Sequence, residues 1–120
     1  ACLPKEVSHK DAVYNLSRAA LFSASLLTGK YENLRTAVHD KLHQPYRMEL
    51  IPHARDVFDT AYSLGAYASY ISGAGPSLMA IVDNDNRFFC GKMRFALDKM
   101  GLSTWQVHEL HIDNIGTRII

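Results

Sequence analysis

The sequence predicts an α+β fold in which a four-stranded, mostly antiparallel sheet is covered by helices on one face. Helical periodicity dominates the first 65 residues, and two short apolar segments follow on either side of a glycine-rich turn. A further helical segment and two strand-like segments complete the chain. This order lacks the even alternation of strands and helices that parallel crossover folds show. The 120 residues contain no internal repeat and no long linker, which indicates one domain.

The first helix is expected between Ser8 and Gly29. Serine is a good N-cap because its side chain accepts a bond from a free backbone N–H, and glycine adopts the left-handed conformation of a C-cap. The outer, polar stripe is expected to carry Asp11, Asn15, Arg18 and Ser25. The side chains at helical spacing that are expected to face inward are Ala12, Val13, Leu16, Ala19, Ala20, Ser23, Leu26 and Leu27.

Two more helices are expected before the first strand. One covers 31–42 and directs Leu34, Ala37, Val38 and Leu42 inward. Pro45 and Pro52 then bracket a stretch that cannot form one regular helix, because proline lacks the N–H donor and disfavours helical conformation at the preceding residue. Pro52 suits the first position of the third helix, which ends at Gly65. Its inward residues are expected to be Val57, Phe58, Ala61 and Leu64.

The second half of the chain is expected to supply the sheet. Strands are predicted over 67–71 and 78–82, and the second is apolar at every position, as in a central strand. A fourth helix is predicted over 87–100, with Gly101 as its cap and Phe89, Met93, Ala96, Leu97 and Met100 inward. Strands over 104–111 and 116–120, joined by a turn at Asp113 and Asn114, complete the predicted sheet.

Composition indicates a cytoplasmic globular protein. The net charge is +1, which gives no support to nucleic-acid or membrane-surface binding, and no apolar run is long enough to span a bilayer. Cys2 and Cys90 are far apart and form no CxxC motif, so both are expected to be reduced. The chain opens at Ala1 without an initiator methionine, and we expect it to be processed or part of a longer protein.

The segment Ser72-Gly73-Ala74-Gly75-Pro76-Ser77 is the strongest candidate for a ligand site. Glycines among small residues let the backbone turn tightly and direct its N–H groups toward an external phosphate or carboxylate. A glycine-rich turn that serves geometry alone remains the alternative. No Walker-type Gly-x4-Gly-Lys-Ser/Thr motif is present, so a phosphate loop of that kind is excluded.

Arg47 is the strongest single-residue candidate. It follows Pro45 in an irregular connection, and its guanidinium could bind a carboxylate or phosphate through two parallel hydrogen bonds. A solvated arginine that caps the carbonyl groups of the preceding helix is the alternative, and Arg18 has the same two interpretations. His39 and His43 have the spacing of a metal-binding pair, but no third ligand accompanies them, so a polar helix end is favoured.

Four segments together resemble the homoserine kinases, a family within the GHMP small-molecule kinases. They are Leu3-Pro4, the run 11–18, the block Asp40-Lys41-Leu42-His43-Gln44-Pro45-Tyr46-Arg47 with Leu50-Ile51-Pro52, and the glycine turn 72–77. The glycine turn is similar to the third motif of the superfamily, and the Asp-x4-Pro-Tyr-Arg block narrows the resemblance to the homoserine kinases. The resemblance covers essentially the whole chain but only the C-terminal portion of the family's length. The resemblance implies a ferredoxin-like C-terminal domain over 1–120.

The resemblance implies an enzyme that transfers the γ-phosphate of ATP, with Mg²⁺, to the hydroxyl of L-homoserine in threonine biosynthesis. Arg47 would bind the substrate carboxylate, and residues 72–77 would support the phosphate-binding loop. That loop, the carboxylate that holds Mg²⁺ and an arginine ahead of Leu3-Pro4 belong to the N-terminal ATP-binding portion, which is expected to be absent. This chain would then hold no catalytic residue, bind no cofactor tightly, be inactive alone and self-associate, with a homodimer expected.

Two other interpretations remain open at this point. One is a stand-alone module that keeps this fold and uses the glycine turn to bind a small anion or a partner chain. The other is a GHMP kinase for a different small alcohol, against which the block from Asp40 to Arg47 argues.

Overall fold

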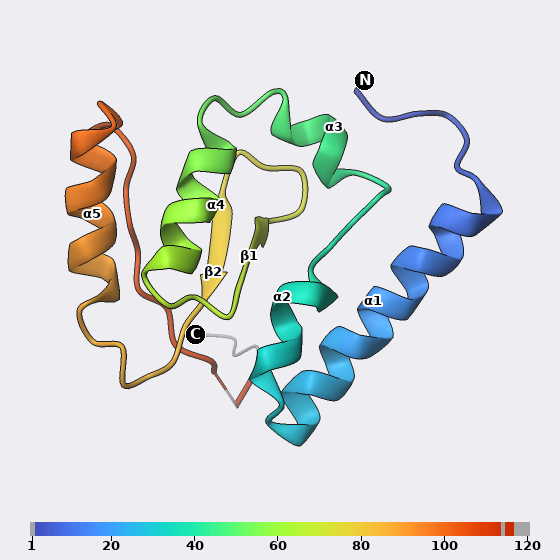
Figure 1. The fold of residues 1–120 in the computed structure, drawn as a ribbon, viewed down its shortest axis with the longest axis horizontal. Coiled ribbons are helices and arrows are strands. Elements are labelled where there is room, and N and C mark those ends of the chain that lie inside the picture. Colours follow the sequence, from blue (N-terminus) through green and yellow to red (C-terminus); the bar gives the residue numbers. More distant parts are fainter. Residues whose placement is uncertain (1, 114, 117–120) are drawn as a thin grey trace.

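The computed structural model, which describes residues 2–113 and 115–116, shows an α+β arrangement around a short β-hairpin (Figure 1). Strands β1 and β2 are antiparallel, with Ala68 opposite Ile81 and Ile71 opposite Leu78. Helix α4 contacts both β1 and α5, whereas α1 contacts mainly η1 and α2. In chain order the elements are α1 (His9–Thr28), the 3-10 helix η1 (Tyr31–Asn33), α2 (Leu34–Ala37), α3 (Gln44–Met48), α4 (Ala54–Ser63), β1 (Ala68–Ile71), β2 (Leu78–Ile81) and α5 (Phe89–Lys99).

The prediction of four strands is wrong for the described part of the chain, which holds a two-stranded sheet. Residues 104–111 form no strand, while 117–120 of the fourth predicted strand and Asn114 of the predicted turn lie outside the described residues. Residues 104–111 run alongside α5 (Figure 1), where Arg94 Nη2 donates to the Val107 carbonyl over 2.9 Å. Only Trp105 and Val107 of this segment pack against the core, so it has few apolar side chains to bury.

The predicted ends of α1 are confirmed. The Ser8 hydroxyl accepts a hydrogen bond from the Asp11 backbone N–H over 3.1 Å, and Gly29 closes the helix in the left-handed conformation with φ +70°. The Ser8 hydroxyl also donates to the Asp11 carboxylate, and this bond, with Lys41, holds the pKa of Asp11 below its usual value.

The predicted inward face of α1 is wrong. Leu16 is 71% exposed and Leu27 is 88% exposed, whereas Ser25 on the predicted outer stripe is fully buried. The side chain of Asn15, also on that stripe, bonds with the connection between α2 and α3. Periodicity identified the apolar stripe correctly, but the helix turns its polar stripe toward the rest of the described chain.

The second predicted helix ends at Ala37 rather than Leu42. Of its four predicted inward residues, Leu34 and Ala37 are buried, whereas Val38 and Leu42 lie beyond the helix and are half-buried. The polypeptide then turns and begins the five-residue helix α3, which carries Pro45 in its first turn, where the missing N–H donor costs nothing. The stretch between the two prolines therefore contains a helix that was not predicted, and Arg47 lies on this helix rather than in an irregular connection.

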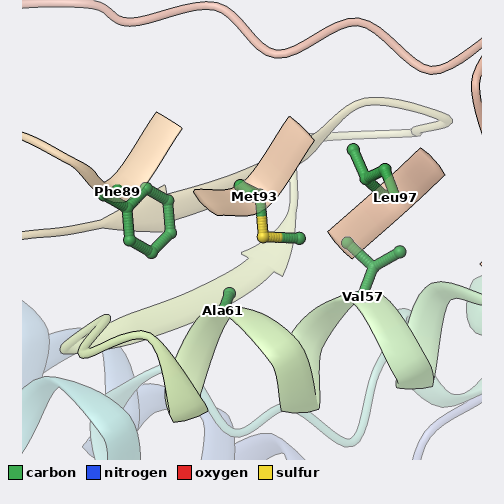
Figure 2. Packing of buried hydrophobic residues seen from close by; sticks show 5 residues of the cluster. All are labelled: Val57, Ala61, Phe89, Met93 and Leu97. Carbon is green, nitrogen blue, oxygen red and sulfur yellow. The ribbon is translucent and has the colours of Figure 1, made fainter. Parts of the chain in front are cut away.

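The core lies on both sides of α4. On one side, Val57 and Ala61 face three side chains of α5, namely Phe89, Met93 and Leu97 (Figure 2). On the other side, α4 contributes Ala54 and Phe58 to a second cluster with Ile51 and Ile71. Six of the nine predicted inward residues of α4 and α5 are confirmed as buried core, whereas Leu64 and Met100 are half-buried against it and Ala96 belongs to neither cluster. The second cluster supports the end of β1, where the glycine turn begins.

Two further predictions concern the cysteines and membrane-spanning segments. Cys2 and Cys90 are both half-buried free thiols, as predicted. None of the described helices combines the length and the apolar character that crossing a bilayer requires.

Candidate functional site

The glycine turn connects β1 to β2 and exposes backbone donors. It is closed by two internal hydrogen bonds, from Ser72 N–H to the Ser77 carbonyl and from Gly75 N–H to the Ser72 carbonyl, at 2.9 and 3.0 Å. The N–H groups of Gly73 and Ala74 have no partner among the described residues, and both residues are exposed. Two neighbouring free amides on an exposed turn are the donors that an anion-binding nest requires.

The two glycines of the turn differ in their surroundings. Both have positive φ, +55° at Gly73 and +78° at Gly75. A Cβ atom at Gly75 would lie 3.1 Å from Ile51 Cδ1 and 3.3 Å from Ile71 Cγ2, whereas at Gly73 nothing lies within 4 Å. Gly75 thus lets the turn approach the second core cluster closely, while Gly73 serves the backbone conformation alone.

Arg47 contacts the glycine turn directly. Its Nη1 donates a hydrogen bond of 2.8 Å to the carbonyl of Ala74, although the two residues are 27 positions apart in the sequence. The Arg47 Nε is buried and has no partner among the described residues. The bond to Ala74 leaves further donors of the guanidinium free, since arginine carries five N–H groups. The two strongest candidates from the sequence therefore lie side by side.

Asp40 holds the helix that carries Arg47. Its carboxylate is 8% exposed and accepts hydrogen bonds from the backbone N–H groups of His43 and Gln44, at 2.7 and 2.6 Å. The Asn15 amide of α1 donates to the other carboxylate oxygen and accepts from the Lys41 N–H over 2.9 Å. Asp40 thus caps the start of α3 and connects it to α1.

Gln44 connects α3 to β1. Its side-chain oxygen accepts a 2.8 Å hydrogen bond from the Ile71 N–H, and its amide nitrogen donates to the Val38 carbonyl over 2.8 Å. Ile71 immediately precedes the glycine turn. The two ends of the site, α3 and the turn, are therefore joined twice, through Gln44 and through Arg47.

Replacing Asp40 by alanine is expected to destabilise the fold by about 2–3 kcal/mol, because two N–H groups of α3 lose a charged acceptor. Burial raises the pKa of Asp40, but the hydrogen bonds from His43, Gln44 and Asn15 outweigh it and lower the pKa below the usual value. A lowered pKa means that this contribution is complete above the unfolded-state value near pH 4 and is lost as pH falls through the folded-state value.

Urea unfolding of the unaltered protein and of the Asp40→Ala variant, between pH 7 and pH 3, measures this pH-dependent contribution to stability. The difference in free energy of unfolding is expected to stay constant down to about pH 5 and to shrink below about pH 4. A difference that does not change over this range would show that the Asp40 charge contributes nothing. Asp11 and Asp83 also have lowered pKa values, but both persist in the variant and cancel in the comparison.

The remaining candidates do not join this site. The Arg18 guanidinium lies over the Tyr14 ring, 4.7 Å from its centroid, and Arg18 lines a hollow of about 380 Å³ with His43 and Tyr70. His43 Nε2 lies 3.9 Å from Asp40. Within the described residues, His, Cys, Asp and Glu side chains form no group of three that could hold a metal ion.

Sequence reasoning did not assign roles to Asp40, Gln44 and Asn15. A usable signal was present for Asp40, since an aspartate three to four residues before the first turn of a proline-containing helix is well placed to cap it. Nothing local indicated the bond between Gln44 and Ile71, because the two residues are 27 positions apart.

The chain is similar to proteins of one enzyme family. The family model described as GHMP kinases C terminal matches residues 19–89. Homoserine kinase from Clostridium beijerinckii is 50% identical over 118 residues, which cover 98% of this chain and 39% of that protein. Homoserine kinase from Caldicellulosiruptor bescii is 42% identical over 118 residues, covering 98% of this chain and 38% of that protein.

A solved structure agrees with these sequence matches. The crystal structure of homoserine kinase from Cytophaga hutchinsonii superposes with a TM-score of 0.71 at 28% identity, covering 82% of this chain and 32% of that one. This chain spans about two fifths of the length of the curated relatives described above. The family model covers more than half of the sequence, and the chain therefore belongs to the family of GHMP kinase C-terminal domains.

Proposed function

We propose that this chain is the C-terminal, substrate-binding part of a homoserine kinase. The parent protein would transfer the γ-phosphate of ATP to the side-chain hydroxyl of L-homoserine and give O-phospho-L-homoserine, a step of threonine biosynthesis in the cytoplasm. ATP and Mg²⁺ would be held mainly by the N-terminal portion of the parent. The similarity to homoserine kinases over 98% of this chain supports the proposal.

The contact between Arg47 and Ala74 is the observation that carries the proposal. It joins a guanidinium suited to a carboxylate to a turn with two free amides suited to a phosphate. Phosphoryl transfer depends mainly on positioning the reactants and stabilising charge. Arg47 would orient the amino acid through its carboxylate, and the turn would support the phosphate-binding loop beside it.

The parent protein is expected to release ADP from ATP in the presence of L-homoserine, whereas this chain alone is expected to release none above background. The reason is that the described residues offer an anion-binding turn and a carboxylate-binding arginine but no metal-binding group. A coupled ADP assay with Mg²⁺, ATP and L-homoserine measures both proteins. Turnover by the isolated chain would refute this division of labour, and a parent that ignores L-homoserine but phosphorylates another small alcohol would refute the substrate.

A further inference from the structure

One face of α1 is apolar and exposed in the described part of the chain. We define the outer stripe of α1 as Val13, Leu16, Ala20, Ser23 and Leu27, which recur at alternating intervals of three and four residues. All five side chains are exposed in the structure. This spacing places them along one side of a helix about 30 Å long, and it is the spacing at which one helix packs against another.

The rest of the described chain does not cover the outer stripe. The opposite face of α1 meets the rest of the domain, through buried Ser25 and through Asn15, which bonds with Asp40 and Lys41. Phe22 also lies on that side and meets the Tyr70 ring edge-on at 6.3 Å between centroids. With its inner face occupied in this way, α1 cannot turn the outer stripe toward its own domain without breaking these contacts.

The outer stripe has the composition of a buried surface. Between residues 12 and 28 the helix carries one charged side chain, Arg18, which lies over Tyr14 rather than on the stripe. A solvent-facing helix surface normally carries charged and polar residues. Exposed apolar patches that run the length of an element mark surfaces where another body packs.

The length of the relatives supplies a candidate for the body that covers the outer stripe. The proteins that match this chain over 98% of its length extend well beyond it, since the matched region is 38–39% of each of the two relatives described above. The family description names this region as C-terminal, and the segment that leads into α1 carries Leu3 and Val7, which are exposed as well. The family description thus places most of the remaining three fifths of such a protein ahead of this region in the same polypeptide.

We propose that the outer stripe of α1 is the docking surface for the N-terminal portion of the parent protein. This proposal rests on the proposed function only in assuming a parent of the relatives' length. Docking here fixes α1, and Asn15 connects α1 to Asp40 and thereby to the helix that carries Arg47. The covering portion would thus hold the substrate-binding arginine in place from outside the domain.

Thiol labelling in the parent protein tests the docking surface. Leu16→Cys and Leu110→Cys are prepared in a Cys2→Ser, Cys90→Ser background with any other cysteines of the parent replaced. The two leucines are matched, being 71% and 74% exposed here. We expect a maleimide to react at least tenfold more slowly at position 16 than at position 110 in the folded parent, and at equal rates in denaturant. Equal rates in the folded parent would overturn the proposal.

Two further measurements distinguish docking within one polypeptide from pairing between two copies of the protein. Protection of position 16 that vanishes on dilution would assign the stripe to a second copy and overturn the proposal, whereas protection independent of concentration supports it. A Leu16→Asp parent is expected to melt at least 5 °C lower than a Leu110→Asp parent, and equal melting temperatures would contradict docking. None of these readouts needs kinase activity, so a wrong substrate assignment would leave them unchanged.

Discussion

Replacing Arg47 by alanine in the proposed parent kinase is expected to raise the KM for L-homoserine about 30- to 150-fold. The loss corresponds to about 2–3 kcal/mol, the contribution of a charge-assisted hydrogen-bond pair to a carboxylate. The KM for ATP is expected to change less than about twofold, because Arg47 would bind the amino acid rather than the nucleotide. Steady-state kinetics with each substrate varied in turn measures both values.

Two variants make this result interpretable. Arg55→Ala removes an exposed arginine whose ion pair with exposed Glu49 spans 3.4 Å, and it is expected to leave both KM values unchanged. Arg47→Lys keeps the charge but lacks the planar fork, so its KM for L-homoserine is expected to lie between those of the unaltered and alanine proteins. An unchanged KM for L-homoserine in Arg47→Ala would defeat the assignment, and equal increases in both KM values would indicate loss of fold instead.

The contact between Arg47 and Ala74 also limits how the arginine can move. One guanidinium nitrogen bonds with the turn, and the Asp40 and Gln44 bonds fix the first turn of the short helix. An arginine held in this way loses less conformational entropy when it binds a ligand than one on a free side chain. Under the proposed function, the turn would therefore contribute to binding the substrate carboxylate as well as to supporting the phosphate-binding loop.

Local sequence signals predicted the elements whose ends and cores are defined locally. Ser8 and Gly29 mark the ends of α1 by their own backbone chemistry, and the Gly-rich turn separates two apolar segments that can pair only with each other nearby. The buried face of α5 followed from helical spacing, because Phe89, Met93 and Leu97 form a single apolar stripe that packs against α4 within the described chain. In each case the chain contains both partners of the interaction.

Sequence signals failed where the deciding partner is distant. The exposed side of α1 could not be predicted, because apolar spacing does not say which body covers the stripe. The break after Ala37 is followed by Asp40, whose carboxylate accepts from the first N–H groups of α3 and also bonds with Asn15, 25 positions away on α1. Residues 104–108 alternate between polar and apolar positions as a strand would, but alternation does not supply a pairing partner. In the described part of the chain, an arginine rather than a neighbouring strand takes the Val107 carbonyl.

The candidate site was predictable in parts but not as an assembly. Arg47 and the turn 72–77 were identified separately, by the chemistry of a guanidinium and of small residues. Their contact spans 27 positions, and so does the bond from Gln44 to Ile71. Both depend on how α3 sits against β1, which no local pattern encodes.

Gly75→Ala is expected to destabilise the fold by about 2–5 kcal/mol, whereas Gly73→Ala is expected to cost about 1–2 kcal/mol. Both substitutions place a Cβ on a residue with positive φ, and this backbone strain alone accounts for the cost of about 1–2 kcal/mol expected for Gly73→Ala. Only at Gly75 does the added atom also meet side chains, at 3.1 Å from Ile51 and 3.3 Å from Ile71, and overpacking a core costs a further 1–3 kcal/mol or so. Urea unfolding of the two variants measures the difference.

The comparison of these two glycines isolates the packing of the turn from its backbone conformation. Equal losses at the two positions would mean that Ile51 and Ile71 move aside freely and that the turn is not held against the core. A larger loss at Gly75 would show that this close approach helps to set the position of Ala74, whose carbonyl bonds with Arg47. In the parent kinase, Gly75→Ala should then also raise the KM for L-homoserine, while Gly73→Ala, which leaves Ile51 and Ile71 untouched, should raise it less.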